Sequence, residues 1–91
     1  MALLECKVCK GLRDAEVTVE VSDYSGRREF LPVEGDMIEQ QGDQSNLPVT
    51  ILQLDKAKKA AIVSLPAEAD SGAHRTWVKL ANLKDYSEAP A

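Results

Sequence analysis

Two cysteines with the spacing C-x-x-C form the most reactive pair in the chain. Cys6 and Cys9 enclose Lys7 and Val8, a spacing that occurs in redox dithiols and in halves of zinc sites. The residues from Ala2 onward alternate like a strand, however, and a strand directs residues three apart to opposite faces. We therefore expect Cys6 to be a buried, small apolar side chain and Cys9 to be partly exposed. A thiol redox site or a structural metal site at this pair stays as the alternative.

The single histidine offers a second arrangement with possible chemistry. His74 follows Asp70 and Ser71, so the residue types of a Ser-His-Asp relay are present. Because all three lie within one short turn segment, the local backbone fixes their separation and does not allow the relay geometry. We expect an exposed turn histidine, no catalytic residue and no bound cofactor. The chain is predicted not to be an enzyme, and no small-molecule substrate is evident.

Basic and aromatic side chains give a third candidate, a surface that binds a partner. Aromatic residues make up only 4% of the chain, and an aromatic side chain in a surface depression often carries much of a binding energy. The predicted interaction surface comprises Trp77, Arg75, Lys79, Tyr24 and Arg28. A second basic group, Lys56, Lys58 and Lys59, lies at one hairpin tip. Either group suits an acidic partner, although solvated charge that prevents edge-to-edge pairing is the ordinary interpretation.

The stretch from Leu47 to Leu83 must position most of these residues, and it predicts three strands joined by polar turns. Its first strand contains Val49, Ile51, Leu52 and Leu54, its second is Ala60 to Leu65, and its third alternates Thr76, Val78 and Leu80 with Trp77 and Lys79. Pro66 ends the second strand because proline cannot donate to a ladder. Ile51 and Ile62 are expected to point into the core. A short helix over Lys56–Ala61 is the alternative to the first turn.

The N-terminal half predicts a hairpin. In Glu16 to Val21, three valines (Val17, Val19 and Val21) alternate with polar residues, as in a half-buried antiparallel strand. After a turn at Asp23 to Gly26, the segment Arg27 to Val33 should return beside it, which places Arg28 near the preceding glutamates. Pro32 marks that second strand as an edge, or as bulged at that point.

The remaining segments read as turns, a loop and ends. Gly11 to Asp14 and Glu34 to Asp36 predict breaks in the strands. Gln40 to Asn46 is polar throughout and predicts an exposed, mobile loop. Lys84 to Tyr86 is expected to add a last short strand, and Ser87 to Ala91 to form a frayed tail.

The segment Gly72 to Leu83 resembles the end of an SH3-like barrel. In such a barrel a hairpin strand ends in an aromatic-apolar pair, and a 3₁₀ turn and a short closing strand follow. Trp77-Val78 matches the pair, and Ala81-Asn82-Leu83 matches the turn. The resemblance covers residues 47–86 at the level of architecture. It implies an all-β, five- to six-stranded antiparallel barrel over residues 1–86, with a tail at 87–91. The chain lacks the acidic-aromatic sequence of signalling SH3 domains, so proline-rich ligands are not implied.

Charge and composition limit the possible functions. The net charge is −4, and residues 1–46 hold ten acidic against five basic residues, a field that disfavours nucleic-acid backbones. No apolar run reaches membrane-spanning length and no secretory segment is evident, so a cytoplasmic location is expected. We predict a non-catalytic interaction or scaffold domain with an unknown protein partner or self-association, for example a homodimer through the edge strand Arg27–Val33. RNA binding through the lysine-bearing hairpin is a further alternative.

Overall fold

The structure is a computed structural model that describes residues 2–13 and 15–84. The strict alternation of valine and polar residues in Glu16 to Val21 forms one strand of a hairpin. Glu16–Ser22 forms strand β2, which pairs antiparallel with β3, Arg28–Glu34. Val19 and Val21 are buried and Val17 packs against the core, as the alternation predicts. The turn between the strands and the return of β3 also lie where the sequence placed them.

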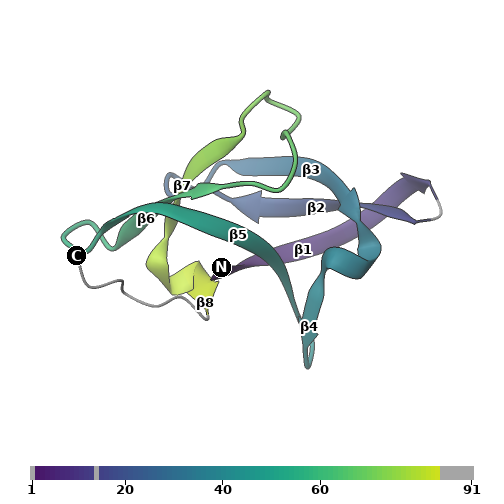
Figure 1. Cartoon of the computed structure of the whole chain (residues 1–91), viewed down its shortest axis with the longest axis horizontal. Helices are drawn as coiled ribbons and strands as arrows, with labels where there is room; N and C mark the ends of the chain where they lie inside the picture. Colours follow the sequence, from purple (N-terminus) through teal and green to yellow (C-terminus); the bar gives the residue numbers. More distant parts are fainter. Residues whose placement is uncertain (1, 14, 85–91) are drawn as a thin grey trace.

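The strands form one antiparallel sheet that curls into a half-barrel (Figure 1). The remaining elements are β1 (Ala2–Arg13), η1 (Gly35–Met37), β4 (Glu39–Gln41), β5 (Gln44–Asp55), β6 (Ala60–Ser64), β7 (Arg75–Lys79), η2 (Leu80–Asn82) and β8 (Leu83–Lys84). The main path runs β3-β2-β1-β5-β6-β7, while β4 pairs with β5 and β8 pairs with β1. The all-β antiparallel class and the 3₁₀ turn near residues 81–83 are confirmed. The described residues form eight strands, because short pairings add β4 and β8 to the six of the main path.

The two longest strands, β1 and β5, each pair with one strand of the main path along their first half and with another along their second half. β1 pairs with β5 from Ala2 to Cys6 and with β2 from Lys7 onward. β5 in turn pairs with β1 over its first half and with β6 over its second, from Thr50 to Asp55. A strand that is shared between two curled regions bends the sheet around one interior.

Aliphatic side chains from every strand of the main path fill that interior. The largest of the fully buried ones are Leu4, Val19, Val21, Leu31, Leu47, Val49, Val63 and Val78. Burying a side chain of this kind contributes about 1.5–3 kcal/mol before entropy is subtracted, so the core is the main source of stability.

The edge strand β3, at one end of the main path, is hydrogen-bonded to a loop. The backbone N–H of Asp70, in the connection between β6 and β7, donates to the Phe30 carbonyl of β3 at 2.8 Å, and the N–H of Phe30 lies 3.4 Å from Asp70 Oδ1. Pro32 lies on the same strand, which confirms the predicted edge. A homodimer through Arg27–Val33 would have to displace the Asp70 bonds and accommodate a proline that has no N–H.

Three expectations about individual segments are wrong. Gln40–Asn46 is not a loop: β4 and β5 form a hairpin there, with Gly42 at a φ of +65° in the turn, where glycine has no Cβ to clash. Of the break expected at Gly11 to Asp14, the part up to Arg13 is strand, because β1 continues to Arg13 with a register shift after Cys9; Asp14 lies outside the described residues. Ile62 does not point into the core: Ala61 and Val63 are buried, while Ile62 lies directly opposite the exposed Trp77.

The segment Lys56–Lys59 is a turn, so the short helix is excluded. The end of the predicted last strand, at Asp85 and Tyr86, and the expected tail at residues 87–91 lie outside the described residues. The described residues include no helix with the length and apolar character needed to cross a membrane.

Candidate interaction site

The turn between β2 and β3 carries Tyr24, and hydrogen bonds within the turn fix its conformation. The Asp23 carboxylate accepts hydrogen bonds from Ser25 Oγ and from the N–H of Arg27, each at 2.8 Å. Gly26 adopts a φ of +91° and donates to the Asp23 carbonyl. Partial desolvation alone would raise the pKa of Asp23, but these hydrogen bonds outweigh it and lower the pKa below its ordinary value. The turn is therefore fixed by its own side chains, and Tyr24 lies at its tip.

Tyr24 joins this turn to two distant parts of the chain. Its backbone N–H donates to the Trp77 carbonyl of β7 at 2.7 Å. Its hydroxyl donates to the Lys58 carbonyl, in the turn between β5 and β6, at 3.0 Å. Tyr24 thus ties the β2–β3 turn to the strand at the other end of the sheet path.

The turn between β5 and β6 presents basic side chains beside this tyrosine. Asp55 Oδ1 accepts from the N–H of Lys58 at 3.1 Å, and Lys59 adopts a φ of +55°. The Lys59 carbonyl in turn accepts from the N–H of Leu80, the first residue of η2, at 2.9 Å. These bonds bring the lysine-bearing turn against the end of β7.

Two adjoining hollows result, and Tyr24 and Lys58 line both. The first, of about 320 Å³, extends between Tyr24, Ala60 and Trp77. The second, of about 410 Å³, extends from Tyr24 and Lys58 to Lys59, Lys79 and Leu80. Tyr24 is 40% and Trp77 38% exposed, so both rings offer apolar surface to a partner. We call the two hollows together the Tyr24–Trp77 surface.

The structure assembles part of the predicted interaction surface. Tyr24, Trp77 and Lys79 come together as described. Arg75 is exposed on the same strand as Trp77 but lines neither hollow. Arg28 lies 3.8 Å from Glu20 Oε1 of β2, the expected cross-strand pair, and its side chain is 68% exposed; it too lines neither hollow.

Lys58 and Lys59 were assigned to a separate hairpin tip, and their place beside Tyr24 was missed. Alternation in β7 was sufficient to put Trp77 and Lys79 on one face. No local pattern, in contrast, connects a tyrosine in one turn with lysines more than thirty positions along the chain.

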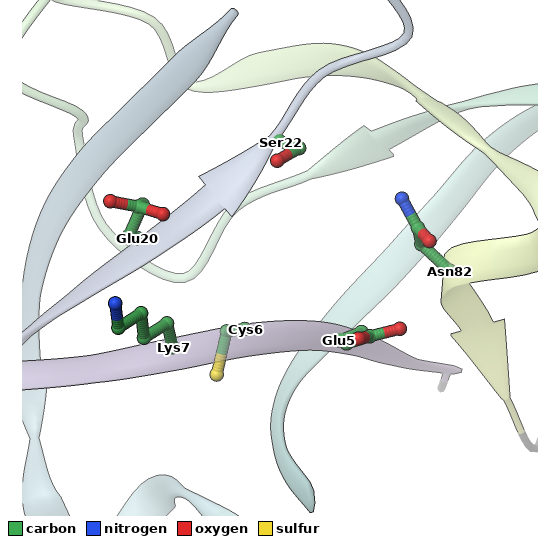
Figure 2. A pocket seen from close by; sticks show the side chains of 6 residues that line it. All are labelled: Glu5, Cys6, Lys7, Glu20, Ser22 and Asn82. Atoms are coloured by element: carbon green, nitrogen blue, oxygen red, sulfur yellow. The ribbon is translucent and has the colours of Figure 1, made fainter. Parts of the chain in front are cut away.

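A smaller polar hollow lies where β1 changes partner, and Figure 2 shows its side chains. It has a volume of about 210 Å³ and is lined by Glu5, Cys6, Lys7, Glu20, Ser22 and Asn82. In Figure 2 the Cys6 side chain points to the other side of β1 from Lys7. The expected placement of the thiols is confirmed, since Cys6 is buried and Cys9 partly exposed.

The environment of Cys6 does not favour redox chemistry. Burial, with a smaller contribution from the Glu5 charge, raises its pKa to about 11. The thiol is therefore protonated at neutral pH, whereas a redox nucleophile needs a thiolate. No three His, Cys, Asp or Glu side chains of the described residues gather as they would around a metal ion.

The three residues of the considered relay have separate partners. His74 Nε2 lies 3.0 Å from Glu68 Oε2, and Asp70 bonds to β3. Ser71 Oγ donates to Glu29 Oε2 at 2.7 Å. Glu29 is 7% exposed and the sequence reading missed it, although it shares the inward face of β3 with Leu31. The Asp70 and Ser71 contacts hold the β6–β7 connection to β3, the His74 contact lies within that connection, and the three residues have no relay geometry.

Comparison with known proteins does not assign the chain to a family. No protein-family model matches the chain, and no match was found among curated proteins or solved structures.

Proposed function

We propose that this chain is a non-catalytic protein-interaction module that binds a partner protein through the Tyr24–Trp77 surface. One observation carries the proposal: two part-exposed aromatic rings line adjoining hollows built from three segments that are distant in sequence. Aromatic anchors in surface depressions are the side chains that most often dominate binding energies between proteins. A cytoplasmic setting, expected from the sequence, goes with this proposal.

We also propose that the half-barrel is SH3-like, and its chain order supports this. The meander β5–β6–β7 precedes the 3₁₀ turn η2, which directly follows the strand carrying Trp77. β8 then returns to pair with β1 at Leu3 and Leu4. The resemblance in the sequence implies this same succession of hairpin, turn and closing strand.

The proposal is tested by comparing two matched alanine variants of exposed apolar residues. Trp77→Ala removes the anchor on β7, while Leu52→Ala removes an exposed side chain on β5 that lines neither hollow. Proteins captured on the wild-type chain are compared with those captured on each variant, and each captured partner is then titrated in purified form. Circular dichroism checks that both variants keep the fold.

We expect a partner whose binding weakens at least about 30-fold with Trp77→Ala, the loss typical of an anchor residue. The same partner should bind the Leu52→Ala variant like the wild type. Equal affinities for wild type and Trp77→Ala would show that the partner binds elsewhere and would refute the assignment of this surface.

A further inference from the structure

We infer that the Tyr24–Trp77 surface takes an extended acidic segment of its partner, with an apolar side chain in the first hollow and a carboxylate in the second. This inference rests on the proposed function, because it names the chemistry of the partner at that same surface. It follows from the positions of two features: the Trp77 ring lines only the first hollow, and Lys59 and Lys79 line only the second.

The second hollow is basic. Lys58, Lys59 and Lys79 line it, and none of the described residues that line it is acidic. None of the three lysines forms an ion pair with another described residue. In a chain of net charge −4, three lysines with no carboxylate partner in the described part of the chain attract an acidic segment rather than a basic one.

The first hollow suits an apolar side chain because, of the two hollows, only this one includes the Trp77 ring. Its walls include the Trp77 and Tyr24 rings and Ala60, a residue that is only 1% exposed. Among the described residues that line it, Asp23 is the only acidic one. The Asp23 carboxylate is already engaged by Ser25 and the N–H of Arg27, so it is less available to a ligand.

The strand geometry sets the spacing of the two ligand groups. Trp77 and Lys79 lie two positions apart on one face of β7, which corresponds to about 6.6 Å at about 3.3 Å per residue. An extended segment that runs along β7 has the same repeat. Its apolar residue and its first acidic residue should therefore also be two positions apart, as Phe-x-Asp or Asp-x-Phe.

The test uses short synthetic peptides and the fluorescence of Trp77, the only tryptophan in the chain. One peptide carries Phe-Gly-Asp-Asp within a Gly/Ser context, a second has both aspartates replaced by asparagine, and a third has serine in place of phenylalanine. The protein is the full chain, as wild type, Lys79→Ala or Lys7→Ala. Lys7→Ala removes the same charge from β1, at a residue that lines neither hollow.

We expect the aspartate peptide to bind about ten-fold more tightly than the asparagine peptide at low salt, since each exposed ion pair contributes a factor of about 1.5–5. Added salt should remove this preference. Lys79→Ala should weaken binding of the aspartate peptide about three-fold, and Lys7→Ala should leave it unchanged. The serine peptide should bind most weakly, because it leaves the first hollow empty.

The possible failures separate the inference from the proposed function. Equal binding of the aspartate and asparagine peptides overturns the acidic ligand, while a captured partner that still requires Trp77 leaves the proposed function standing. Tighter binding of a uridine decamer than of the aspartate peptide, with the same Trp77 response, overturns both in favour of RNA. Concentration-dependent dimers in sedimentation that Trp77→Ala abolishes identify a second copy as the occupant and overturn the inference.

Discussion

Replacing the most deeply buried amide with valine should stabilise this protein. Asn46, in β5 opposite Glu5 of β1 and Glu39 of β4, has no exposed surface. Its Nδ2 donates to the Glu39 carbonyl at 3.4 Å, and its Oδ1 has no hydrogen-bond partner among the described residues. An unsatisfied buried acceptor costs about 1–3 kcal/mol, while a bond as long as 3.4 Å contributes about 0.5 kcal/mol at most.

The expected gain follows from these two values. Asn46→Val removes the unpaired oxygen, sacrifices the long bond and adds a side chain that suits a strand. The free energy of unfolding should therefore rise by about 1–2 kcal/mol, or about 5–10 °C in Tm for a chain of this length. Urea unfolding followed by Trp77 fluorescence should show a higher midpoint and an unchanged slope.

Two further variants separate burial from strand propensity. Gln53→Val makes the same kind of change at an exposed position of the same strand, so it should change stability by less than about 0.5 kcal/mol. Asn46→Asp puts a carboxylate in place of the buried amide and should destabilise by several kcal/mol. If Asn46→Val lowers the free energy of unfolding by 1 kcal/mol or more, the amide is satisfied in solution and the reasoning fails.

Two substitutions and two measurements on the wild-type protein test the turns and the thiols. Lys59→Gly should raise the free energy of unfolding by about 1 kcal/mol in urea, because the φ of +55° at Lys59 is unfavourable for any residue with a Cβ. Tyr24→Phe should lower it by about 0.5–1 kcal/mol in thermal unfolding, because the hydroxyl bond to the Lys58 carbonyl is lost. Stability should fall between pH 9 and 11, because burial raises the pKa of Cys6 from 9.0 to about 11 and only the unfolded thiol then ionises. At pH 8 a thiol reagent should modify Cys9 in the native protein, and Cys6 only after unfolding.

Two of these predictions have matched control variants, and a third has an outcome that would contradict it. Lys58→Gly should destabilise, because Lys58 has no positive φ; equal effects at the two lysines would contradict the strain at Lys59. Cys6→Ala should reduce the loss of stability between pH 9 and 11, and an unchanged pH profile would mean that other groups cause it. A Tyr24→Phe variant as stable as the wild type would show that water replaces the hydroxyl bond.

The sequence predicted which face is buried in those strands where only one face is apolar. Glu16 to Val21 alternates valine with polar residues, so a single register satisfies it. Ala60 to Leu65 carries apolar residues on both faces, and nothing local distinguishes Ile62 from Val63. The choice depends on pairing: Ile62 lies opposite Trp77, and a register shift lies between Ile51 and Gln53 of the neighbouring strand.

The hairpin of β4 and β5 was missed because its composition is that of a loop. Gly42-Asp43 between two short segments is nevertheless a hairpin turn signal, and the polar residues on either side hid it. The burial of Asn46 was beyond local reasoning, because it depends on the pairing of β5 with β1, a strand some forty residues away in the sequence.

The candidate site shows the same division between local and long-range information. Trp77 and Lys79 share a face because they are two positions apart in one strand, and that much is local. Tyr24 joins them only because its N–H and its hydroxyl bond to β7 and to the β5–β6 turn. These two bonds fix the tyrosine before any partner arrives, so binding need not order it, and a preformed anchor loses less entropy on association than a mobile one. The bonds of Tyr24 that join the β2–β3 turn to β7 and to the β5–β6 turn therefore also hold the Tyr24 ring in the position that a partner would contact.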